Sequence, residues 1–494
     1  MVLCREHPGV SSRTTLTLEG DDARRLPAGS AEPGALNQPP PGDPSAPGPD
    51  APPATGGDSI PATLGQPSAG RFWLAVLLTG AGTGLGAAAL TRLLEATQHL
   101  MWPGPGASLL EAAGRASAVR HVLVLLGAGL LVGTGQVLLG RLTSANGIDI
   151  TEAIWFHAGR LPALRTLGSA LLSVFAVGMG VSLGREGAPK QTGAVIANFV
   201  SDKGRLSDEQ RRLLVACGAG AGMGAAYGVP LGGALFALEV MRGVLALRYV
   251  LPALFASAVA TVVSWAVLPD APTYSIPAFP SSASVVVWAL LAGPIAGVVS
   301  VGYVRLVRWA DRSKPRGWQR LLVPVPALGL LGAVSIWFPQ VLGNGKDVSA
   351  LAFAGQVAPA LLLGLLVLKP AAILLCMRSG APGGLFTPSL TVGAMLGGVL
   401  GHAWSWAWPG VPPGLFALLG AGAVLAATTQ GPISAVVLLM ELTGRDRSFI
   451  LPLLVAVGTA TLVARTIEPR SIYDARLSDE EVEARRRLRD QAAR

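Results

Sequence analysis

The sequence predicts an all-α polytopic membrane protein with two inverted-topology repeats of broken, partly re-entrant helices. Two distant fragments match, GVPLGGALFALEVM from Gly228 to Met241 and QGPISAVVLLMELT from Gln430 to Thr443. In each fragment a proline can begin an apolar helix that ends in a single carboxylate, Glu239 or Glu441. Repeats with broken apolar helices are a recurring plan of transporters and channels, in which the substrate lies near the bilayer midplane between the halves.

The composition places this chain in a lipid bilayer. Of its 494 residues 51% are hydrophobic and 14% are charged, 63 are glycine, and the formal net charge is +9. The mean hydropathy of +0.52 is rare for a water-soluble protein of this size. The arginines lie mostly in tails and connecting segments, without aromatic interleaving, so basic loops beside anionic lipid are expected and no nucleic acid.

Neither the cysteines nor the histidines form a pattern that holds a metal ion. The three cysteines have no ligand spacing, and the five histidines are scattered without a serine partner, so the sequence predicts no disulfide framework, no metal and no cofactor. These residues are Cys4, Cys217, Cys376, His7, His99, His121, His157 and His402.

The two ends differ in composition from the rest of the chain. Residues 1–70 are rich in Pro, Gly and Ala and predict a disordered tail. Its first residues, MVLCREHPGV, lack the long apolar core of a signal peptide, so this tail is expected in the cytoplasm. Residues 478–494 predict a charged, helical cytoplasmic stub. Between the ends, membrane repeat one is expected over 71–270 and repeat two over 271–477.

Apolar segments follow one another through both repeats, and several are shorter than the roughly 20 residues of a full crossing. Short segments suit half-spanning helices whose exposed backbone is buried in protein or faces a wet cavity. In order, the segments are Phe72 to Leu94, Val119 to Leu139, Leu164 to Leu183, Leu213 to Tyr227, Pro230 to Met241, Val250 to Leu268, Ala283 to Val307, Leu321 to Phe338, Ala358 to Met377, Leu385 to Trp408, Leu415 to Thr429, Pro432 to Leu442 and Ile450 to Ala464.

The break SLGREGAPKQTGA, Ser182 to Ala194, places Glu186 between glycines just before a run that can continue as a helix from Gly193. A carboxylate there lies at the positive end of a helix dipole, where unpaired N–H groups bind anions. Glu186 would compete with a dissolved anion and leave when protonated, which is the behaviour of a gate. The alternative is a capped helix in which Glu186 pairs with Arg185 or Lys190.

A matching break, SGAPGGLFTPSLTVGAML, runs from Ser379 to Leu396. Its Gly384 lies 200 positions after Gly184, close to the 202 that separate Pro230 and Pro432. Two helix starts can therefore face one another across a pseudo-twofold axis and favour an anion between them. The backbone N–H groups of Leu385 and Phe386 would be the donors; the alternative is a proline-terminated core turn.

The motifs GREGAPKQTG, GAPGGLFTP and ANGID, with a late tyrosine in PRSIYDARL, resemble the CLC family of chloride channels and proton-coupled chloride exchangers over about residues 71 to 477. The resemblance implies the CLC-type fold, a gating role for Glu186, and a homodimer in the plasma membrane with one pore per subunit and both termini cytoplasmic. It implies chloride as the transported ion, held by anion-binding residues Asn146, Gly147, Ile148, Arg185, Glu186, Gly187, Leu385, Phe386 and Tyr473.

The first motif departs from the family pattern, which commonly reads Gly-Ser-Gly-Ile-Pro where this chain has Ala145 to Asp149. An asparagine amide replaces the serine hydroxyl and still donates to an anion. Asp149 adds an acid near the inner mouth. Chloride is the expected ion. Nitrate, bromide or another small anion remains an alternative, and fluoride is expected less than these.

A second departure concerns proton coupling. Family exchangers commonly end the first proline-started helix with two adjacent acids, but here Glu239 is followed by Val240. Valine cannot carry a proton, so passive, channel-like conduction is expected. The alternative is an exchanger that uses another proton route, such as Glu239. This residue precedes Val240 by one position and therefore lies about 100° from it around the helix.

Other classes remain as alternatives. An enzyme could use GAGAGMG, Gly218 to Gly224, as a dinucleotide loop with Glu239 as the ribose acid, but no strand precedes it and no enzyme is expected. A non-transporting membrane scaffold is a further alternative, which an anion flux assay in liposomes distinguishes from a transporter.

Overall fold

The computed structural model describes residues 60–61, 66, 68–104, 108–143, 148–279, 282–444, 449–474 and 477–493. By its internal contacts the chain divides into residues 1–53, which lie outside the described part, and residues 54–494, which hold every helix named below. The expectation of a disordered tail over residues 1–70 therefore falls mostly outside the described residues.

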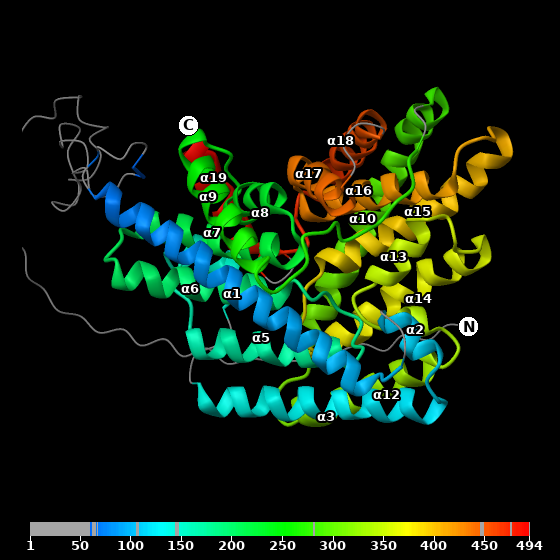
Figure 1. Ribbon diagram of the computed structural model, residues 1–494, viewed down its shortest axis with the longest axis horizontal. Helices are drawn as coiled ribbons and strands as arrows, with labels where there is room; N and C mark the ends of the chain where they lie inside the picture. The colour runs from blue at the N-terminus through cyan, green and yellow to red at the C-terminus, as the bar shows by residue number, and fades with distance from the viewer. Residues whose placement is uncertain are drawn as a thin grey trace, which may run out of the picture. The chain divides into compact units, whose positions relative to one another are not determined.

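Helices follow one another along the first half of the described chain, coloured blue to green in Figure 1. They are α1 (Ala69–Met101), α2 (Leu109–Gly114), α3 (Ala118–Leu142), α4 (Ile150–Phe156), α5 (Ala163–Gly178), α6 (Gly187–Lys203), α7 (Asp208–Tyr227), α8 (Pro230–Phe236), the π-helical turn η1 (Ala237–Arg242) and α9 (Leu247–Ser264).

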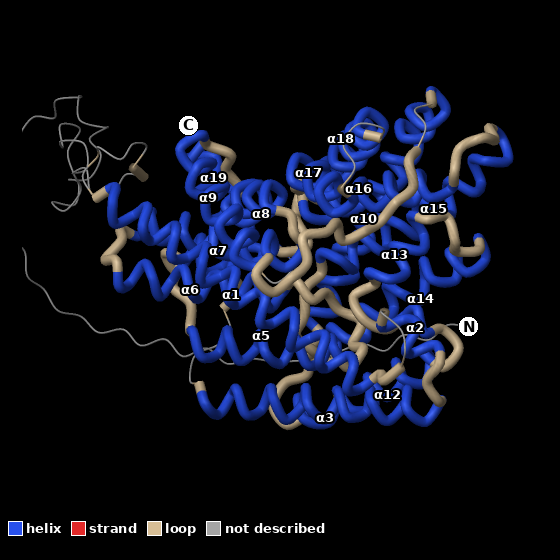
Figure 2. Tube along the Cα trace, viewed as in Figure 1, coloured by secondary structure: helices blue, strands red, loops and turns tan. Residues whose placement is uncertain are grey.

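The second half, coloured green to red, repeats this plan and then adds a helix outside the predicted repeats. Its elements are α10 (Ala283–Arg312), α11 (Gln319–Leu322), α12 (Pro324–Ser335), the 3₁₀ turn η2 (Pro339–Val341), α13 (Lys346–Phe353), α14 (Pro359–Arg378), α15 (Phe386–Ala407), α16 (Pro413–Thr429), α17 (Pro432–Thr443), α18 (Ile450–Ile467) and α19 (Asp479–Ala493). In the described residues no strand is present (Figure 2), which confirms the predicted all-α class.

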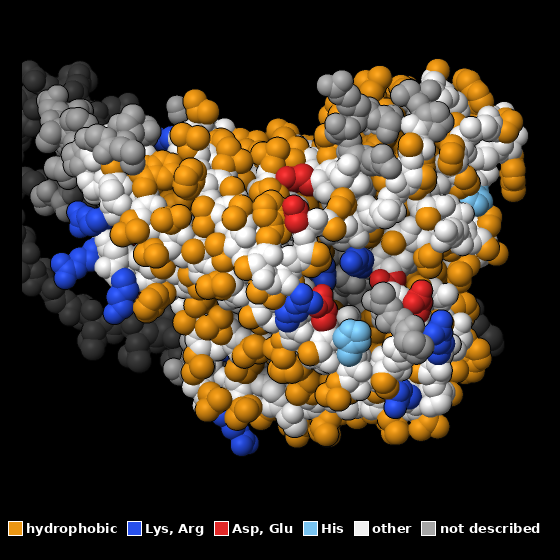
Figure 3. All heavy atoms as spheres, viewed as in Figure 1, with side chains coloured by type: hydrophobic (Ala, Val, Ile, Leu, Met, Phe, Trp, Pro, Cys, Tyr) orange, Lys and Arg blue, Asp and Glu red, His pale blue; other side chains and the backbone are white. Residues whose placement is uncertain are grey.

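Six of the described helices are long and apolar enough to cross a membrane, namely α1, α3, α9, α10, α14 and α18. Their outward faces carry large apolar side chains, such as Leu123, Val262 and Leu462, each about 60% exposed or more. Figure 3 shows hydrophobic side chains spread over much of one face of the molecule. Such a surface is stable against lipid, whereas in water it would aggregate.

Equivalent helices of the two halves pack in the same way. α1 packs on α9 as α10 packs on α18, and α6 packs on α7 as α15 packs on α16. Glycines set both close contacts: a Cβ at Gly193 would meet the Gly218 carbonyl oxygen at 2.0 Å, and one at Gly393 would meet the Gly420 oxygen at 2.5 Å. These two helix contacts are equivalent, and their glycines lie about 200 residues apart, as the predicted internal repeat requires.

The glycine-rich stretch Gly218 to Gly224 lies inside α7, and all seven of its residues are buried. Gly220 and Gly222 pass so close to the carbonyls of Gly233 and Pro189 that an added Cβ would lie 2.3 and 2.2 Å away. These glycines therefore serve helix packing. A dinucleotide loop between a strand and a helix, the alternative considered above, is contradicted.

The short helices were the hardest to predict. α4 and α13 lie outside every predicted apolar segment, because they are only seven and eight residues long and helices this short depend on tertiary contacts. α6 begins at Gly187, immediately after Glu186, and not near Gly193. The helix start is therefore closer to the carboxylate than the sequence suggested.

The charged stub forms α19, which binds the end of repeat two through ion pairs. Arg470 donates to Asp479 Oδ1 at 2.7 Å and holds the pKa of this carboxyl below its usual value. Arg485 pairs with Asp474 and donates to the Val240 carbonyl oxygen at 3.1 Å. Through Arg485, α19 contacts both Asp474, beside Tyr473, and the end of the first proline-started helix.

Candidate functional site

The two glycine breaks meet, although they come from different halves of the chain. Gly184 and Gly384 form an isolated antiparallel bridge, and each N–H donates to the other's carbonyl oxygen at 2.8 Å. α6 begins three residues after Gly184 and α15 begins two residues after Gly384. The bridge therefore fixes two helix starts beside one another, and a Cβ at Gly187 would lie 3.2 Å from the Gly384 nitrogen.

Glu186 is fully buried, and its carboxylate lies at the start of α15. The Phe386 N–H donates to Oε1 at 2.7 Å, while the hydroxyls of Thr387 and Tyr227 lie 3.2 and 3.3 Å from Oε2. The Tyr227 and Thr387 hydroxyls are also bonded to one another at 2.8 Å. An uncompensated buried carboxylate would be costly, and here N–H and O–H donors at the positive end of a helix offset that cost.

Gly184 and Gly384 make room for this carboxylate. A Cβ at either position would lie 2.1 or 2.2 Å from Glu186 Oε1, far inside van der Waals contact. Neither glycine has a positive φ, so the requirement comes from space and not from backbone conformation. The glycines of both breaks thus define a pocket for two oxygen atoms.

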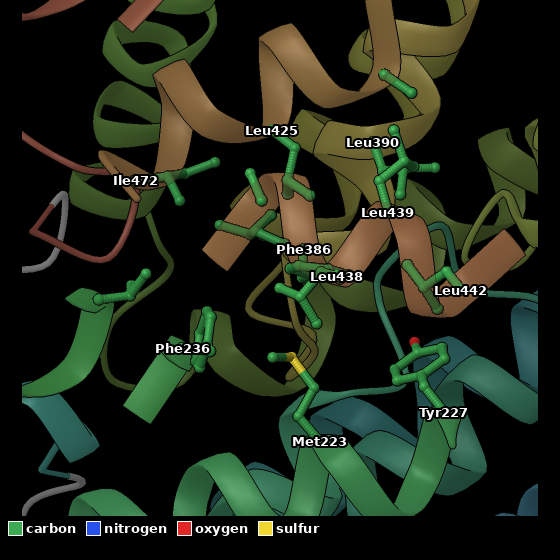
Figure 4. Close-up of a cluster of buried hydrophobic side chains, with 14 of the residues drawn as sticks. Met223, Tyr227, Phe236, Phe386, Leu390, Leu425, Leu438, Leu439, Leu442 and Ile472 are labelled. Carbon is green, nitrogen blue, oxygen red and sulfur yellow. The ribbon is translucent and has the colours of Figure 1, made fainter. Parts of the chain in front are cut away.

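Aromatic rings lie near the carboxylate, and Figure 4 shows three of them, Tyr227, Phe236 and Phe386, within a buried apolar cluster. The Phe386 ring lies 6.4 Å from the Tyr227 ring and 6.3 Å from the Phe236 ring, and Phe236 lies 5.7 Å from the Tyr473 ring. These rings come from α15, α7, α8 and the segment after α18. They exclude water, which strengthens the interaction between the N–H dipoles and any anion held there.

Cavities reach the chain neighbours of Glu186 on both sides. One of them, of about 120 Å³, is lined by Arg185, Lys346 and Asp347 and is called the Arg185 cavity. Another, of about 60 Å³, is lined by Gly187, Lys190, Asp149, Leu385 and Tyr473, among others, and is called the Lys190 cavity. Leu385, Tyr473 and Gly187 thus share one cavity, whereas Arg185 lines the other.

Arg185 stacks on Tyr227, with the guanidinium carbon 4.8 Å from the ring centre. The Arg185 guanidinium and the Glu186 carboxylate contact different groups, the Tyr227 ring and the donors at the start of α15. Because the described donors to Glu186 come from α7 and α15, the carboxylate is held by tertiary contacts.

The ANGID motif is only partly described. Asn146 and Gly147 lie outside the described residues. Ile148 lines a different cavity, with Phe156 and Leu161, and not the Lys190 cavity. Asp149 accepts from the Thr151 N–H at 2.9 Å and forms a capping box with Glu152, so this acid begins α4.

Glu239 and Glu441 each cap the start of a helix in the other half of the chain. Glu239 accepts from the N–H groups of Ile433 and Ser434 at 3.1 and 2.6 Å, at the start of α17. Glu441 accepts from those of Leu231 and Gly232 at 3.0 and 2.6 Å, at the start of α8. This reciprocal geometry favours a structural role for both acids.

Val240 follows Glu239 and is 4% exposed. Both residues line a further cavity of about 260 Å³ with Arg465, Asp474 and Arg485, called the Glu239 cavity. Polar and charged groups are therefore present beside Val240. Val240 itself contributes no titratable group.

Tyr227, Thr387 and Lys190 were not among the predicted site residues. Thr387 lies within the GLFTP motif, and its hydroxyl, next to the two expected N–H donors, was a usable signal. Tyr227 carried a weaker one, as the last residue of α7 before Gly228. Lys190 was considered only as an ion-pair partner for Glu186.

A polytopic helical protein in which two glycine-broken helix starts meet around a buried carboxylate is typical of membrane transporters and channels. The family model described as "Voltage gated chloride channel" matches residues 128–465. The chain therefore belongs to the voltage gated chloride channel (CLC) family, and it is a multi-pass membrane protein.

Relatives and solved structures agree with this assignment. The chain is 32% identical over 405 residues to the "Putative chloride channel protein ClcB-like" of Ralstonia nicotianae, covering 78% of this chain and 93% of that protein. It is 32% identical over 312 residues to the "H(+)/Cl(-) exchange transporter ClcA" of Vibrio parahaemolyticus, covering 60% of this chain and 66%, just under two thirds, of that protein.

Two solved structures share the fold. A crystal structure titled as a slow cyanobacterial Cl⁻/H⁺ antiporter superposes with a TM-score of 0.72 at 23% identity, covering 86% of this chain and 99% of that one. A structure titled as a eukaryotic CLC transporter gives a TM-score of 0.65 at 20% identity, covering 82% of this chain and 73% of that one. These likenesses concern the fold alone.

Proposed function

We propose that this protein carries chloride or a similar small anion passively across the membrane, through a pore gated by Glu186. The observation that supports this most directly is the hydrogen bond from the Phe386 N–H to Glu186 Oε1, 2.7 Å long. The side-chain carboxylate occupies the anion position of a helix start, so a dissolved anion that displaces it meets the same donors. Protonation of Glu186 removes the charge that competes with this anion.

The conduction mode that we favour is channel-like. The Val240 side chain cannot carry a proton, and both carboxylate oxygens of Glu239 accept hydrogen bonds from N–H groups at the start of α17. An exchanger is the second candidate, because relatives are named H⁺/Cl⁻ exchange transporters and Glu239 lines a polar cavity. A non-transporting scaffold is the candidate of another class.

Chloride is the proposed ion because the family and the relatives are named for it. A helix start attracts any small anion, so nitrate and bromide are the competitors to test. We further propose a homodimer with one pore per subunit in the plasma membrane, and both termini in the cytoplasm. The proposed repeats are 71–270 and 271–477.

The test is an anion flux assay on purified protein in liposomes, with reversal potentials measured under separate pH and chloride gradients. A passive pore gives a potential that follows chloride alone, whereas an exchanger also responds to pH. Absence of flux above empty liposomes would support the scaffold. Replacing chloride with nitrate or bromide ranks the anions.

Glu186→Gln tests the gate in the same assay. The amide mimics the protonated side chain, so flux should rise and lose most of its dependence on pH. Unchanged pH sensitivity would contradict the gating role. Glu483→Gln, at an exposed pair with Arg487 in α19, is the control and should keep the wild-type pH profile.

A further inference from the structure

Lys190 is a buried cation one helical turn from Glu186. Its backbone N–H donates to the Glu186 carbonyl oxygen at 3.2 Å, within the first turn of α6, and the residue is 5% exposed. Residues four apart lie on the same face of a helix, so Lys190 follows Glu186 along the face that α6 presents to the site. Lysine is seldom buried unless its charge is compensated.

Aromatic rings hold the ammonium. Lys190 Nζ lies 4.7 Å from the centre of the Tyr473 ring and 5.2 Å from that of the Phe236 ring. Both distances fall within the range of cation–π attraction, which stabilises the charged form of the amine. The same two rings belong to the aromatic group around the Glu186 pocket.

The Lys190 cavity is lined by Lys190 and by Leu385, which precedes the start of α15. Its lining includes Leu385, whose N–H is one of the expected anion donors, and Tyr473. Asp149 is the acid that faces this cavity, and its Oδ1 caps α4 by accepting from the Thr151 N–H.

A larger basic cavity adjoins it. This cavity, of about 240 Å³, is lined by Arg165, Lys314 and Arg320; Lys314 pairs with Asp311, so Arg165 and Arg320 supply its positive charge. It shares Gly187, Gln191 and Gly383 with the Lys190 cavity. Basic walls of low dielectric constant concentrate anions, so anions are favoured up to the shared glycines.

We propose that Lys190 is an anion-binding residue, whose ammonium holds a small monovalent inorganic anion in the Lys190 cavity. This gives the pore an ion position one helical turn from the Glu186 pocket. The inference rests on the proposed function and deepens it, because it names a residue that sets how tightly the permeating anion binds. A lysine that only packs between two rings is the competing explanation.

The first experiment is bromide anomalous diffraction from crystals of the wild-type protein. A bromide peak within hydrogen-bonding distance of Lys190 Nζ is the expected result. An empty cavity in crystals that hold bromide elsewhere overturns the proposal. This measurement needs no variant, so it decides the question even if substitutions at Lys190 prevent folding.

The second experiment is calorimetric titration of chloride into purified wild-type, Lys190→Met and Lys190→Arg proteins. Methionine keeps the length and ring packing but removes the charge, so chloride should bind at least about tenfold more weakly. Arginine keeps the charge and should restore binding to within about threefold of wild type. Lys203→Met, at the far end of α6, is the matched control and should leave binding unchanged.

Equal binding by Lys190→Met and wild type overturns the inference, and so does equal weakening by the Met and Arg variants. Flux in liposomes separates this failure from failure of the proposed function. If wild type conducts and Lys190→Met binds and conducts alike, the role of Lys190 alone is wrong. If wild type moves no anion, the proposed function is wrong, while the diffraction result still decides whether Lys190 binds one.

Discussion

Gly184 and Gly384 are joined by two backbone hydrogen bonds of 2.8 Å, although they lie 200 residues apart. This bridge brings two helix starts together, and the absence of a Cβ on both residues leaves the space that the Glu186 carboxylate fills. One contact thus determines both the geometry of the anion position and the room for its gate.

Gly384→Ala should therefore displace the gate. The added Cβ would lie 2.2 Å from Glu186 Oε1, and its nearest neighbours all belong to Glu186, so the side chain must leave. We expect liposome flux to rise and to lose its pH dependence, as in Glu186→Gln.

The control for this prediction is the same change in a Glu186→Ala background, where no carboxylate remains to clash. There Gly384→Ala should have little effect. Gly364→Ala, where a Cβ meets nothing within 4 Å, should behave as wild type. A loss of flux in both backgrounds would mean that the alanine closes the pore itself.

Tyr227→Phe should weaken the closed state. The lost hydroxyl donates to Glu186 Oε2 at 3.3 Å and is bonded to Thr387 at 2.8 Å. A hydrogen bond to a charged group contributes about 1.5 to 3 kcal/mol, so chloride flux at neutral pH should rise about tenfold. Phenylalanine retains the ring under Arg185, and the effect should vanish in Glu186→Gln. An equal rise in that variant would show that Tyr227 acts elsewhere.

Glu239→Gln and Glu441→Gln should lower the free energy of unfolding by similar amounts. Each removes a charge that caps the first turn of a helix in the other repeat, which contributes about 1 to 2 kcal/mol. Denaturant unfolding in detergent micelles measures both losses. Glu483→Gln, at an exposed pair with Arg487, should change little.

A measurement of proton flux distinguishes helix capping by Glu239 from a role as a proton carrier in exchange. If Glu239 carried protons, Glu239→Gln would abolish proton movement while Glu441→Gln would not. Equal destabilisation, with no specific loss of proton movement, is the outcome that reciprocal capping predicts.

The parts of the site that the sequence predicted are those whose signal is local. Glycine breaks, prolines at helix starts and a spacing near 200 residues were enough to place Glu186 opposite Phe386 and to predict the repeat. The glycine breaks and prolines are each carried by a few neighbouring residues, and the spacing comes from comparing the two halves of the sequence, so no knowledge of tertiary contacts was needed.

The parts that were missed depend on contacts between distant segments. Nothing near Tyr227 indicates that its hydroxyl lies beside Glu186, 41 residues earlier. The partners of Glu239 are 194 and 195 residues away, so its capping role is invisible in its own helix. Lys190 is polar inside an apolar repeat, which marks it as unusual but does not identify the rings around it.

Val240→Glu tests why conduction is expected to be uncoupled. Val240 lines the Glu239 cavity, and Arg485, which bonds its carbonyl oxygen, supplies positive charge for a new carboxylate. We expect a chloride gradient to drive measurable proton movement in Val240→Glu liposomes but not in wild type. Val240→Gln has the same size without a titratable group and should move no protons.

Chloride flux is measured in the same liposomes, so a variant that is inactive can be told from one that conducts chloride without protons. If Val240→Glu conducts chloride and still moves no protons, the apolar side chain is not what prevents coupling, and the route between Glu186 and the Glu239 cavity is closed elsewhere. If wild type already moves protons, the channel-like mode is wrong and Glu239 becomes the group to replace next. Only proton movement that requires the carboxylate identifies Val240 as the residue that separates chloride flow from proton flow.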